Sequence, residues 1–594
     1  MQVPGKVSWL GNVNDCRLSF LGSGRRTSWF LVALVAIPGL AGSLPARGAD
    51  PTPPARRELV EKAEQLYKVL KPEERIGQLL MYGFRGTGVN PELTRYLREL
   101  QVGGIILFSS NLIDAPQTAR LCREIRSLTA AGVPPLLAVD QEGGKVTRIS
   151  KGVTVLPGNM ALGATRSQVL AYYGGRITGR ELRLLGVNMN LAPVVDVVSD
   201  PDDQVIGTRS YGSSFELVSE QSSWYIKGLQ EEGIIATAKH FPGHGATGKD
   251  THHTLPSVAR SLSELEGADL QPFIRAVGAG VDTIMTAHVH YTAFDRQRIS
   301  ASLSLNVLRY LRERLGFEGV VIADALEMGA ITRQLSPGEA AVEAILAGND
   351  MVIAVWNGNN KDAVYEALAG AVRSGRIPQS RLHEAVVRIL ALKLKRGLFL
   401  RQNIDPEKLG LLTTARPYAE VAQRIASRSI TLVEEQVRML PLRGEEGKNL
   451  VVLSDHASFL EQMRSSYPGA VFIGLEERRC AEQGADLWAS VSSALGKKRT
   501  LVCGLETLWA VEFLRSRLQP FVRRTIFCSL GSPYLLMDFP GVAAALCSYS
   551  TTEVALAALV DVLTGRKQPE GRLPVELPDP APRGGAKSRG TSNE

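Results

Sequence analysis

Eight short apolar runs, separated by longer amphipathic stretches, constrain the fold of this chain most strongly. They lie at residues 78–84, 104–108, 136–140, 187–193, 234–241, 283–289, 320–324 and 351–355. Helix-competent sequence follows most of them, for example at 116–130 and 339–346. Near-continuous apolar strands that alternate with helices indicate parallel pairing, and eight such units predict a closed (β/α)₈ barrel. An open doubly wound sheet is the alternative arrangement.

Polar residues at the ends of these runs favour the barrel over the open sheet. Five of them stand at the carboxyl ends of predicted strands, namely Asp140, Lys239, His240, His288 and Asp324. In a barrel those ends share one rim, where the active sites of this fold are built. The pattern therefore predicts a polar site at the rim.

At 594 residues the chain exceeds what one hydrophobic core usually serves, and a second β/α series begins at about residue 421. Its apolar runs lie at 450–453, 470–475, 501–504, 525–530 and 543–547. These runs predict a smaller α/β domain after the barrel. It contains neither a GxxxxGK[ST] phosphate loop nor a GxGxxG turn, so nothing in it indicates nucleotide binding.

The chain therefore divides into five predicted regions. They are a leader at 1–49, the barrel at 50–400, a connecting segment at 401–430, the second α/β domain at 431–578 and a tail at 579–594. The tail is rich in Gly, Pro, Ser and Arg, a composition that predicts disorder.

The first 49 residues resemble an export signal. Arg25 and Arg26 precede an apolar run at 29–37 and small residues at 40–43, and the arginine pair is similar to that of a twin-arginine signal. The run is shorter than the roughly 20 apolar residues that a membrane span needs. We expect an exported protein, periplasmic or extracellular, without a stable membrane span once the signal is removed.

Charge and cysteine content exclude several classes of partner and cofactor. The 68 basic and 60 acidic residues give only a mild positive excess, and no basic-aromatic module indicates nucleic-acid binding. The 6 cysteines lack metal-type spacing, and Cys503, Cys528 and Cys547 sit in apolar runs that favour buried thiols over disulfides. We expect no cofactor.

The densest polar segment is the stretch from Lys239 to His253, which holds four of the chain's 8 histidines. A metal site is one interpretation, but HxxxH and HH spacings on a glycine-rich loop are not an established ligand frame. Acid/base chemistry is the other. In the triplet Asp250-Thr251-His252 a carboxylate can orient an imidazole and stabilise its protonated form, the logic of a catalytic dyad.

Two further segments place charged side chains directly after apolar strands. Asp324 ends the strand at 320–324, where it is either an ionised nucleophile in the barrel mouth or the N-cap of a following helix. Asp140 and Arg148 flank a polar stretch after the strand at 136–140, and Arg209, in the segment 206–210, is a further candidate. These residues either bind a ligand's hydroxyl groups or form surface salt bridges.

Taken together, these motifs resemble glycoside hydrolase family 3, in particular its β-N-acetylglucosaminidase branch. The likeness runs in order through 76–81, 103–108, 140–144, 191–196, 206–210, 239–245, Asp250 with His252, 285–288 and the strand that ends at Asp324. Residues 430–577 are more weakly similar to the α/β domain that follows the barrel in two-domain members.

The resemblance implies a retaining β-N-acetylhexosaminidase acting on terminal β-linked N-acetylglucosamine, with peptidoglycan or chitin fragments as expected substrates. Asp324 matches the nucleophile, His252 the acid/base and Asp250 the residue that orients it. The positions that bind the terminal sugar in the family are matched by Asp140, Arg148, Arg209, Lys239 and His240. The sequence departs from the branch at Lys145, where Arg is usual, and at Ala246, where Asp is usual.

Three other functions stay open on the sequence. A β-glucosidase or β-xylosidase of the same fold would take its acid from the second domain, which the Asp250 and His252 pair argues against. A phosphorylase would use phosphate in place of water, since a neutral histidine would not repel it. An inactive carbohydrate-binding cell-wall protein would show decayed catalytic positions, whereas those positions are intact. The oligomeric state is not encoded in any motif.

Overall fold

A computed structural model describes residues 56–129, 132–247, 254–355, 358–400, 416–442 and 448–578. The predicted leader at 1–49, the tail at 579–594 and the first part of the connecting segment lie outside the described residues. Within the described ranges, no helix combines the length and the apolar character needed to cross a bilayer.

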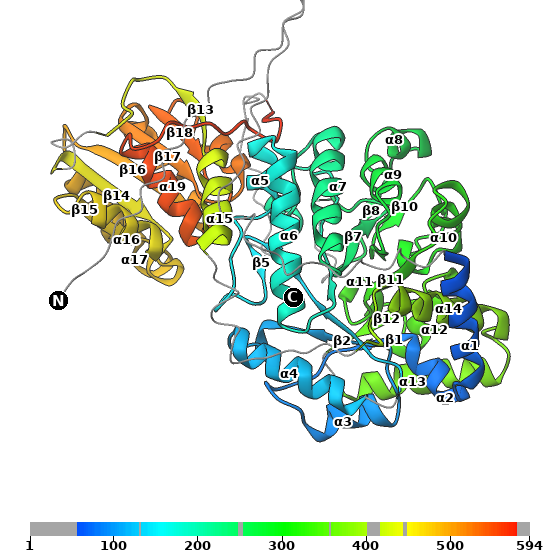
Figure 1. Ribbon diagram of the computed structural model, residues 1–594. Coiled ribbons are helices and arrows are strands. Elements are labelled where there is room, and N and C mark those ends of the chain that lie inside the picture. The colour runs from blue at the N-terminus through cyan, green and yellow to red at the C-terminus, as the bar shows by residue number, and fades with distance from the viewer. Residues whose placement is uncertain are drawn as a thin grey trace, which may run out of the picture. The chain divides into compact units, whose positions relative to one another are not determined.

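Eight parallel strands close into a barrel, as Figure 1 shows. The strands are β1 (Leu80–Tyr82), β2 (Gly104–Leu107), β3 (Leu136–Val139), β6 (Met189–Asn190), β7 (Ile235–Phe241), β9 (Thr283–Thr286), β11 (Val320–Ala325) and β12 (Met351–Ala354). Their order around the barrel is β1-β12-β11-β9-β7-β6-β3-β2. Each lies within, or one residue beyond, one of the eight predicted apolar runs, so the predicted barrel is confirmed and the open sheet is wrong.

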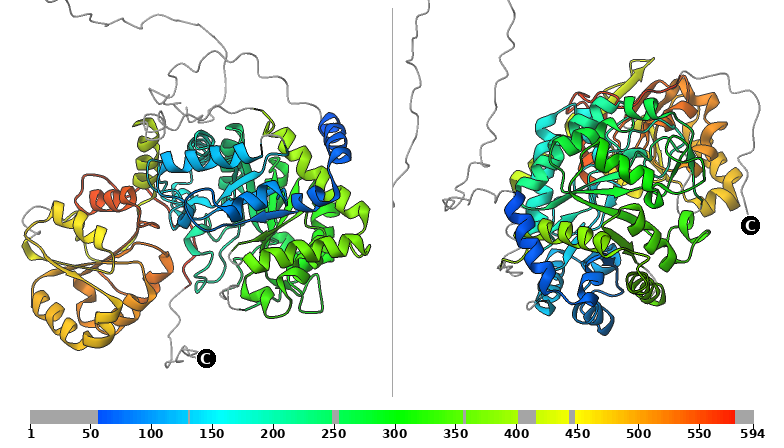
Figure 2. Two further views of the ribbon diagram at one scale, coloured as in Figure 1. Left: turned by 90° about the horizontal axis from the view of Figure 1, so that it is seen from below. Right: turned by 90° about the vertical axis from the view of Figure 1, so that its right-hand side faces the viewer.

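Helices lie around the outside of the strands in both views of Figure 2. The main ones are α2 (Pro72–Gln78), α3 (Pro91–Arg98), α4 (Ala115–Leu128), α6 (Gln168–Leu184), α7 (Phe215–Glu231), α9 (Gln271–Gly278), α12 (Pro337–Ala347), α13 (Gly358–Arg373) and α14 (Gln379–Lys395). Several begin at side-chain caps: Asp114 accepts a hydrogen bond from the Gln117 N–H at the start of α4, and Ser214 accepts one from Leu217 at the start of α7.

A buried carboxylate at the start of β12 ties three segments together. Asp350 is fully buried, and its oxygens accept from Arg312 at 2.6 Å, Arg381 at 3.0 Å and Arg388 at 3.1 Å. It also accepts from the Val321 N–H of β11 at 3.0 Å. Burial alone would raise the pKa of Asp350, but the three guanidinium groups outweigh it and hold that pKa below its usual value.

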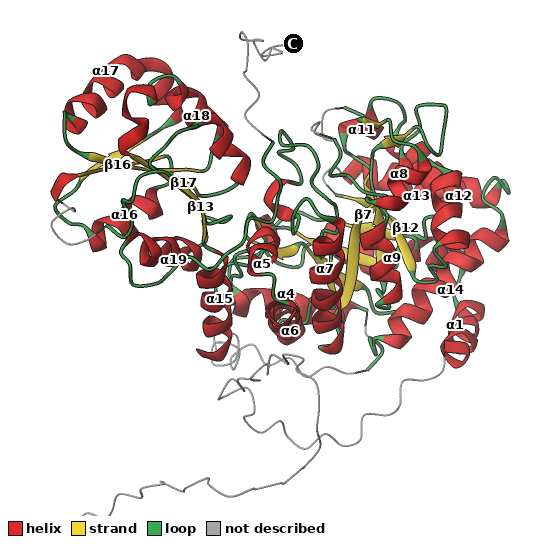
Figure 3. Cartoon of the chain, turned by 90° about the horizontal axis from the view of Figure 1, so that it is seen from above, coloured by secondary structure: helices red, strands yellow, loops and turns green. Residues whose placement is uncertain are grey.

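The second domain is a six-stranded sheet with helices on both faces, as Figure 3 shows. Its strands, in spatial order, are β13 (Thr431–Glu435), β18 (Ala544–Cys547), β17 (Thr525–Ser529), β16 (Thr500–Leu505), β14 (Leu450–Ser454) and β15 (Val471–Gly474). Five of these were predicted. The unpredicted strand, β13, runs antiparallel to β18 at the edge, whereas the others are parallel.

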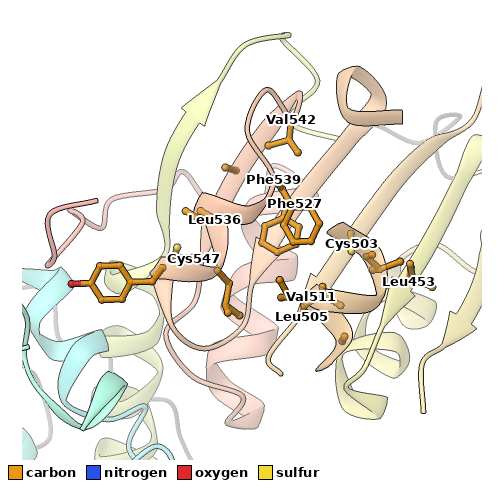
Figure 4. Close-up of a cluster of buried hydrophobic side chains, with 14 of the residues drawn as sticks. Leu453, Cys503, Leu505, Val511, Phe527, Leu536, Phe539, Val542 and Cys547 are labelled. Atoms are coloured by element: carbon orange, nitrogen blue, oxygen red, sulfur yellow. The ribbon is translucent and has the colours of Figure 1, made fainter. Parts of the chain in front are cut away.

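Three cysteines of this domain lie in its hydrophobic core. Figure 4 shows Cys503 and Cys547 among apolar side chains on one face of the sheet, where the Phe527 and Phe539 rings lie 4.4 Å apart. Cys528 belongs to the cluster on the other face. All three are buried free thiols, so the prediction of buried thiols in place of disulfides is confirmed for them.

The connecting segment and the end of the second domain add contacts that the sequence did not indicate. Residues Arg416–Ser429 form a regular helix, α15. Residues 571–576 run back along the barrel: the Arg572 N–H donates to the Ala164 carbonyl, and the Ser213 N–H donates to the Pro574 carbonyl. The boundaries of the five predicted regions stay predictions.

We predict that Asp350→Ala lowers the free energy of unfolding by about 3–5 kcal/mol, because it removes the buried carboxylate that three partly buried guanidinium groups and one N–H share. Urea-induced unfolding followed by tryptophan fluorescence measures the change.

Glu339→Ala is the matched control, since Glu339 forms an exposed ion pair with Arg376. The control should cost less than about 1 kcal/mol. Equal losses in the two variants would contradict the role assigned to Asp350.

Candidate active site

A cavity of about 410 Å³ opens at the carboxyl ends of the barrel strands. Its charged and titratable lining residues are Asp140, Glu142, Arg148, Arg209, Lys239, His240, His244, Asp324 and Glu327. Most lie in the last residues of a barrel strand or in the loop after one, so the carboxyl ends of parallel strands gather residues that are far apart in the sequence. The predicted polar rim is therefore present.

One buried carboxylate, Glu142, joins two of the predicted sugar-binding cations. Its oxygens accept from Arg209 Nε at 2.9 Å and Arg209 Nη2 at 2.8 Å, a bidentate pair. The same group lies 2.7 Å from Lys239 Nζ, which is also 2.7 Å from Asp140 Oδ1. The side chain of Glu142 is 1% exposed, so water does not screen these pairs.

These contacts fix the charge states of the network. Burial by itself would raise the pKa of Glu142, but the charges of Arg209 and Lys239 outweigh it and hold that pKa well below its usual range. In the same way burial would lower the pKa of Lys239, yet Asp140 and Glu142 raise it. Glu142, Arg209 and Lys239 are therefore all charged at neutral pH.

The short hairpin after β3 positions Glu142. Strands β4 (Gln141–Gly143) and β5 (Val146–Thr147) pair antiparallel. The Gln141 N–H donates to Asn190 Oδ1 at 2.9 Å, and Gln141 Oε1 accepts from the N–H of Arg148 at 3.1 Å. The hairpin is thus attached to the end of β6 while it presents Asp140 and Arg148 to the cavity.

Arg148 lies closer to the solvent than the rest of the network. Its Nη2 is 3.8 Å from Asp140 Oδ2, and its guanidinium is 5.8 Å from the centre of the Phe108 ring. Its side chain is 32% exposed, whereas that of Arg209 is 16% exposed. Both line the cavity, so the surface salt bridge considered for them does not describe their surroundings.

His240 is oriented by a second buried carboxylate, Asp196. The ring Nδ1 of His240 lies 2.7 Å from Asp196 Oδ2, and the His240 N–H also donates to that carboxylate. Burial alone would raise the pKa of Asp196, but His240 and His244 outweigh it and hold it below its usual value. With Asp196 on Nδ1, the Nε2 edge of His240 is left for a ligand.

Asp324 stands at the end of β11 and lines the cavity. Its Oδ1 accepts from the Ala325 N–H at 2.8 Å, and His288 Nε2 contacts the Ala325 carbonyl at 3.0 Å. Burial would raise the pKa of Asp324, but the fields of His288 and His240 outweigh it and lower that pKa. The group is an ionised carboxylate suited to nucleophilic attack.

The helix N-cap considered for Asp324 is wrong. Strand β11 continues to Ala325, and the next helix, α11 (Gly329–Thr332), has Met328 as its N-cap. A turn at 326–328 separates the end of β11 from this short helix.

The predicted acid/base pair, Asp250 and His252, lies outside the described residues, so both roles stay predictions. Among the residues that the structure describes, no three His, Cys, Asp or Glu side chains are grouped as metal ligands would be. Lys145, one of the two departures from the branch, is exposed in the turn of the β4–β5 hairpin and lies outside the cavity lining.

Sequence reasoning missed Glu142 and Asp196 as parts of the site. Both stand in motifs that it singled out, Glu142 two residues after the apolar run at 136–140 and Asp196 three residues after the run at 187–193. That position was the available signal. Their partners, Arg209 and His240, are 67 and 44 residues away in sequence, so only the closed barrel reveals the pairing.

Most glycoside hydrolases place carboxyl groups at the scissile bond, and the rim of this barrel presents one ionised carboxylate, Asp324, to the cavity. The chain belongs to glycosyl hydrolase family 3, because the family's N-terminal domain model matches residues 72–392, more than half of the chain.

Individual relatives agree with this assignment. The chain is 29% identical to a β-N-acetylglucosaminidase/β-glucosidase of Cellulomonas fimi, over 85% of this chain and 93% of that one. It is 28% identical to β-hexosaminidase A of Pseudoalteromonas piscicida, over 86% and 97%. A solved family 3 β-N-acetylglucosaminidase from Paenibacillus sp. str. FPU-7 has a TM-score of 0.79 at 34% identity, covering 86% of this chain and 99% of that one.

We predict that Glu142→Gln lowers kcat/KM by about 10²-fold, mainly through KM. The neutral amide no longer holds Arg209 and Lys239 in place, and small displacements of positioning groups have losses of this size. Steady-state kinetics at saturating and subsaturating substrate separate the two parameters.

Glu339→Gln serves as the control, because Glu339 lies outside the cavity lining. Unchanged KM in a folded Glu142→Gln protein would show that the cations hold their places without this carboxylate.

Proposed function

We propose that this protein is a retaining β-N-acetylhexosaminidase that removes terminal β-linked N-acetylglucosamine from glycans. The observation that carries the proposal is the ionised Asp324 carboxylate at the end of β11, in a cavity also lined by Asp140, Arg148, Lys239 and His240. Relatives named as β-N-acetylglucosaminidases and β-hexosaminidases over nearly their whole length support the substrate class.

In the first step, Asp324 attacks the anomeric carbon and the bond to the leaving oxygen breaks. That oxygen takes a proton from His252, which Asp250 orients, and a glycosyl ester on Asp324 remains. In the second step, His252 accepts a proton from water, and the resulting oxygen attacks the anomeric carbon and releases Asp324. Two displacements in sequence preserve the β configuration.

The remaining cavity residues bind the terminal sugar in this proposal. Asp140 accepts from hydroxyl groups while Lys239 and Arg148 donate to them, since charged partners make the stronger hydrogen bonds. His240 contributes its Nε2 edge, because Nδ1 is engaged with Asp196. Arg209, held by Glu142 and by the Val205 carbonyl at 3.1 Å, borders the same pocket.

We also propose that the protein acts outside the cytoplasm on peptidoglycan or chitin fragments. The apolar run after Arg25 and Arg26 supports export, and a role in cell-wall turnover is consistent with such fragments.

Nitrophenyl β-N-acetylglucosaminide and nitrophenyl β-glucoside, compared on the same enzyme, test the substrate class. We predict a kcat/KM at least about 10-fold higher for the acetamido sugar, since a pocket that hydrogen-bonds a substituent discriminates against a sugar that lacks it. A clear preference for glucoside would contradict the proposal. The same assay with phosphate added separates hydrolysis from phosphorolysis, because a phosphorylase would release sugar 1-phosphate.

We predict that Asp324→Ala lowers turnover by about 10⁴-fold or more while the protein stays folded, since the substitution removes the carboxylate that forms the ester. Azide should restore part of the activity on nitrophenyl substrates by occupying the space of the lost carboxylate, and the product should be the α-glycosyl azide. Near-normal turnover in folded Asp324→Ala protein, judged by circular dichroism, would refute the nucleophile.

A further inference from the structure

The mechanism leaves one buried histidine of the cavity without a role. His244 lies three residues after β7, is 3% exposed and lines the cavity. Neither of its ring nitrogens has a hydrogen-bond partner in the described part of the chain. Buried polar side chains are nearly always hydrogen-bonded, because burial removes their bonds to water. A ligand in the cavity is therefore a natural partner for this ring.

The backbone around His244 is held firmly even though the ring is not. Its N–H donates to Asp196 Oδ1 at 2.7 Å, the carboxylate that also orients His240. Gly243 has a φ of 129°, a backbone angle that residues with a side chain rarely adopt. A Cβ on Gly245 would lie 2.2 Å from the Val197 carbonyl oxygen, so glycine is required there as well. The loop thus fixes the imidazole in the cavity wall, with its ring centre 5.8 Å from that of His240.

The ring is uncharged at neutral pH. Burial, together with the neighbouring His240, lowers the pKa of His244 to about 4. One ring nitrogen is then a donor and the other an acceptor. Such a group is matched to a neutral ligand group that itself carries a donor and an acceptor.

The position of His244 points to one part of the terminal sugar. His244 lines the same cavity as the nucleophile Asp324, and its ring centre lies 5.8 Å from that of His240, a predicted sugar-binding residue. Asp324 must face the anomeric carbon, and the nearest substituent to that carbon is the one at C2. In an N-acetylhexosamine this substituent is an amide, which has one N–H and one carbonyl oxygen.

We propose that His244 is a specificity-determining residue that hydrogen-bonds the 2-acetamido group of the terminal sugar. This inference rests on the proposed function and adds to it the residue that separates N-acetylhexosamines from hexoses. In this role His244 contributes to substrate recognition, and the two displacement steps at Asp324 are unchanged.

The test compares His244→Phe with the unaltered enzyme on nitrophenyl β-N-acetylglucosaminide and nitrophenyl β-glucoside. We predict that kcat/KM falls about 30-fold for the acetamido sugar, mainly through KM, and less than about 3-fold for glucoside. The inhibition constants of free N-acetylglucosamine and glucose should rise by about the same factors by which kcat/KM falls for the corresponding substrates. His244→Asn, which keeps a donor and an acceptor, should retain part of the selectivity.

His290→Phe is the matched control. His290 is also buried, but both of its ring nitrogens are engaged, with Ser257 and with the Asp295 carbonyl. This control should lower thermal stability and leave the ratio of the two substrates unchanged. Equal losses on both substrates for His244→Phe, or no loss on either, would overturn the role of His244.

Failure of this inference is distinguishable from failure of the proposed function. An unaltered enzyme that prefers glucoside contradicts the function itself. An unaltered enzyme that prefers the acetamido sugar, with selectivity unchanged in His244→Phe, leaves the function in place and removes only the inference.

Discussion

The functional rim depends on one buried carboxylate, Glu142, placed between two cations. Arg209 and Lys239 each carry a positive charge into a region from which water is largely excluded, and each would repel the other there. Glu142 offsets both charges with bonds of 2.7 to 2.9 Å. Because a buried charge without a partner is strongly unfavourable, removing one member disturbs the rest. The geometry offered to a sugar is thus a property of the network rather than of any single residue.

A second carboxylate, Asp196, plays a similar part on the neighbouring side of the cavity. Its Oδ2 contacts the ring Nδ1 of His240, and its Oδ1 accepts from the N–H of His244. The two carboxylates position different groups at the rim. Glu142 sets the positions of Arg209 and Lys239, which are proposed to bind hydroxyl groups, and Asp196 sets the positions of two imidazoles. Glu142 lies in the hairpin after β3, and Asp196 lies in the segment between β6 and α7.

Most of the fold could be predicted from the sequence because its signal is local. Each barrel strand is buried on both faces, so it appears as a short uninterrupted apolar run, and eight such runs imply the barrel. Strand β13 is not predicted from the sequence for a related reason. It is an edge strand whose burial is only partial, and its sequence ends in two glutamates, so it lacks the apolar run that marks the others.

The sequence by itself determined the order of strands, the family resemblance and the residue types at the rim, including Asp324, Asp140 and Lys239. Those features depend on neighbours along the chain. Only the tertiary structure decided which rim residues meet: that Arg209 is bound by Glu142, that His240 is oriented by Asp196, and that His244 lines the cavity with unused nitrogens. Such pairings depend on the closure of the barrel and on burial, and no local pattern records distances between residues 44 or more positions apart.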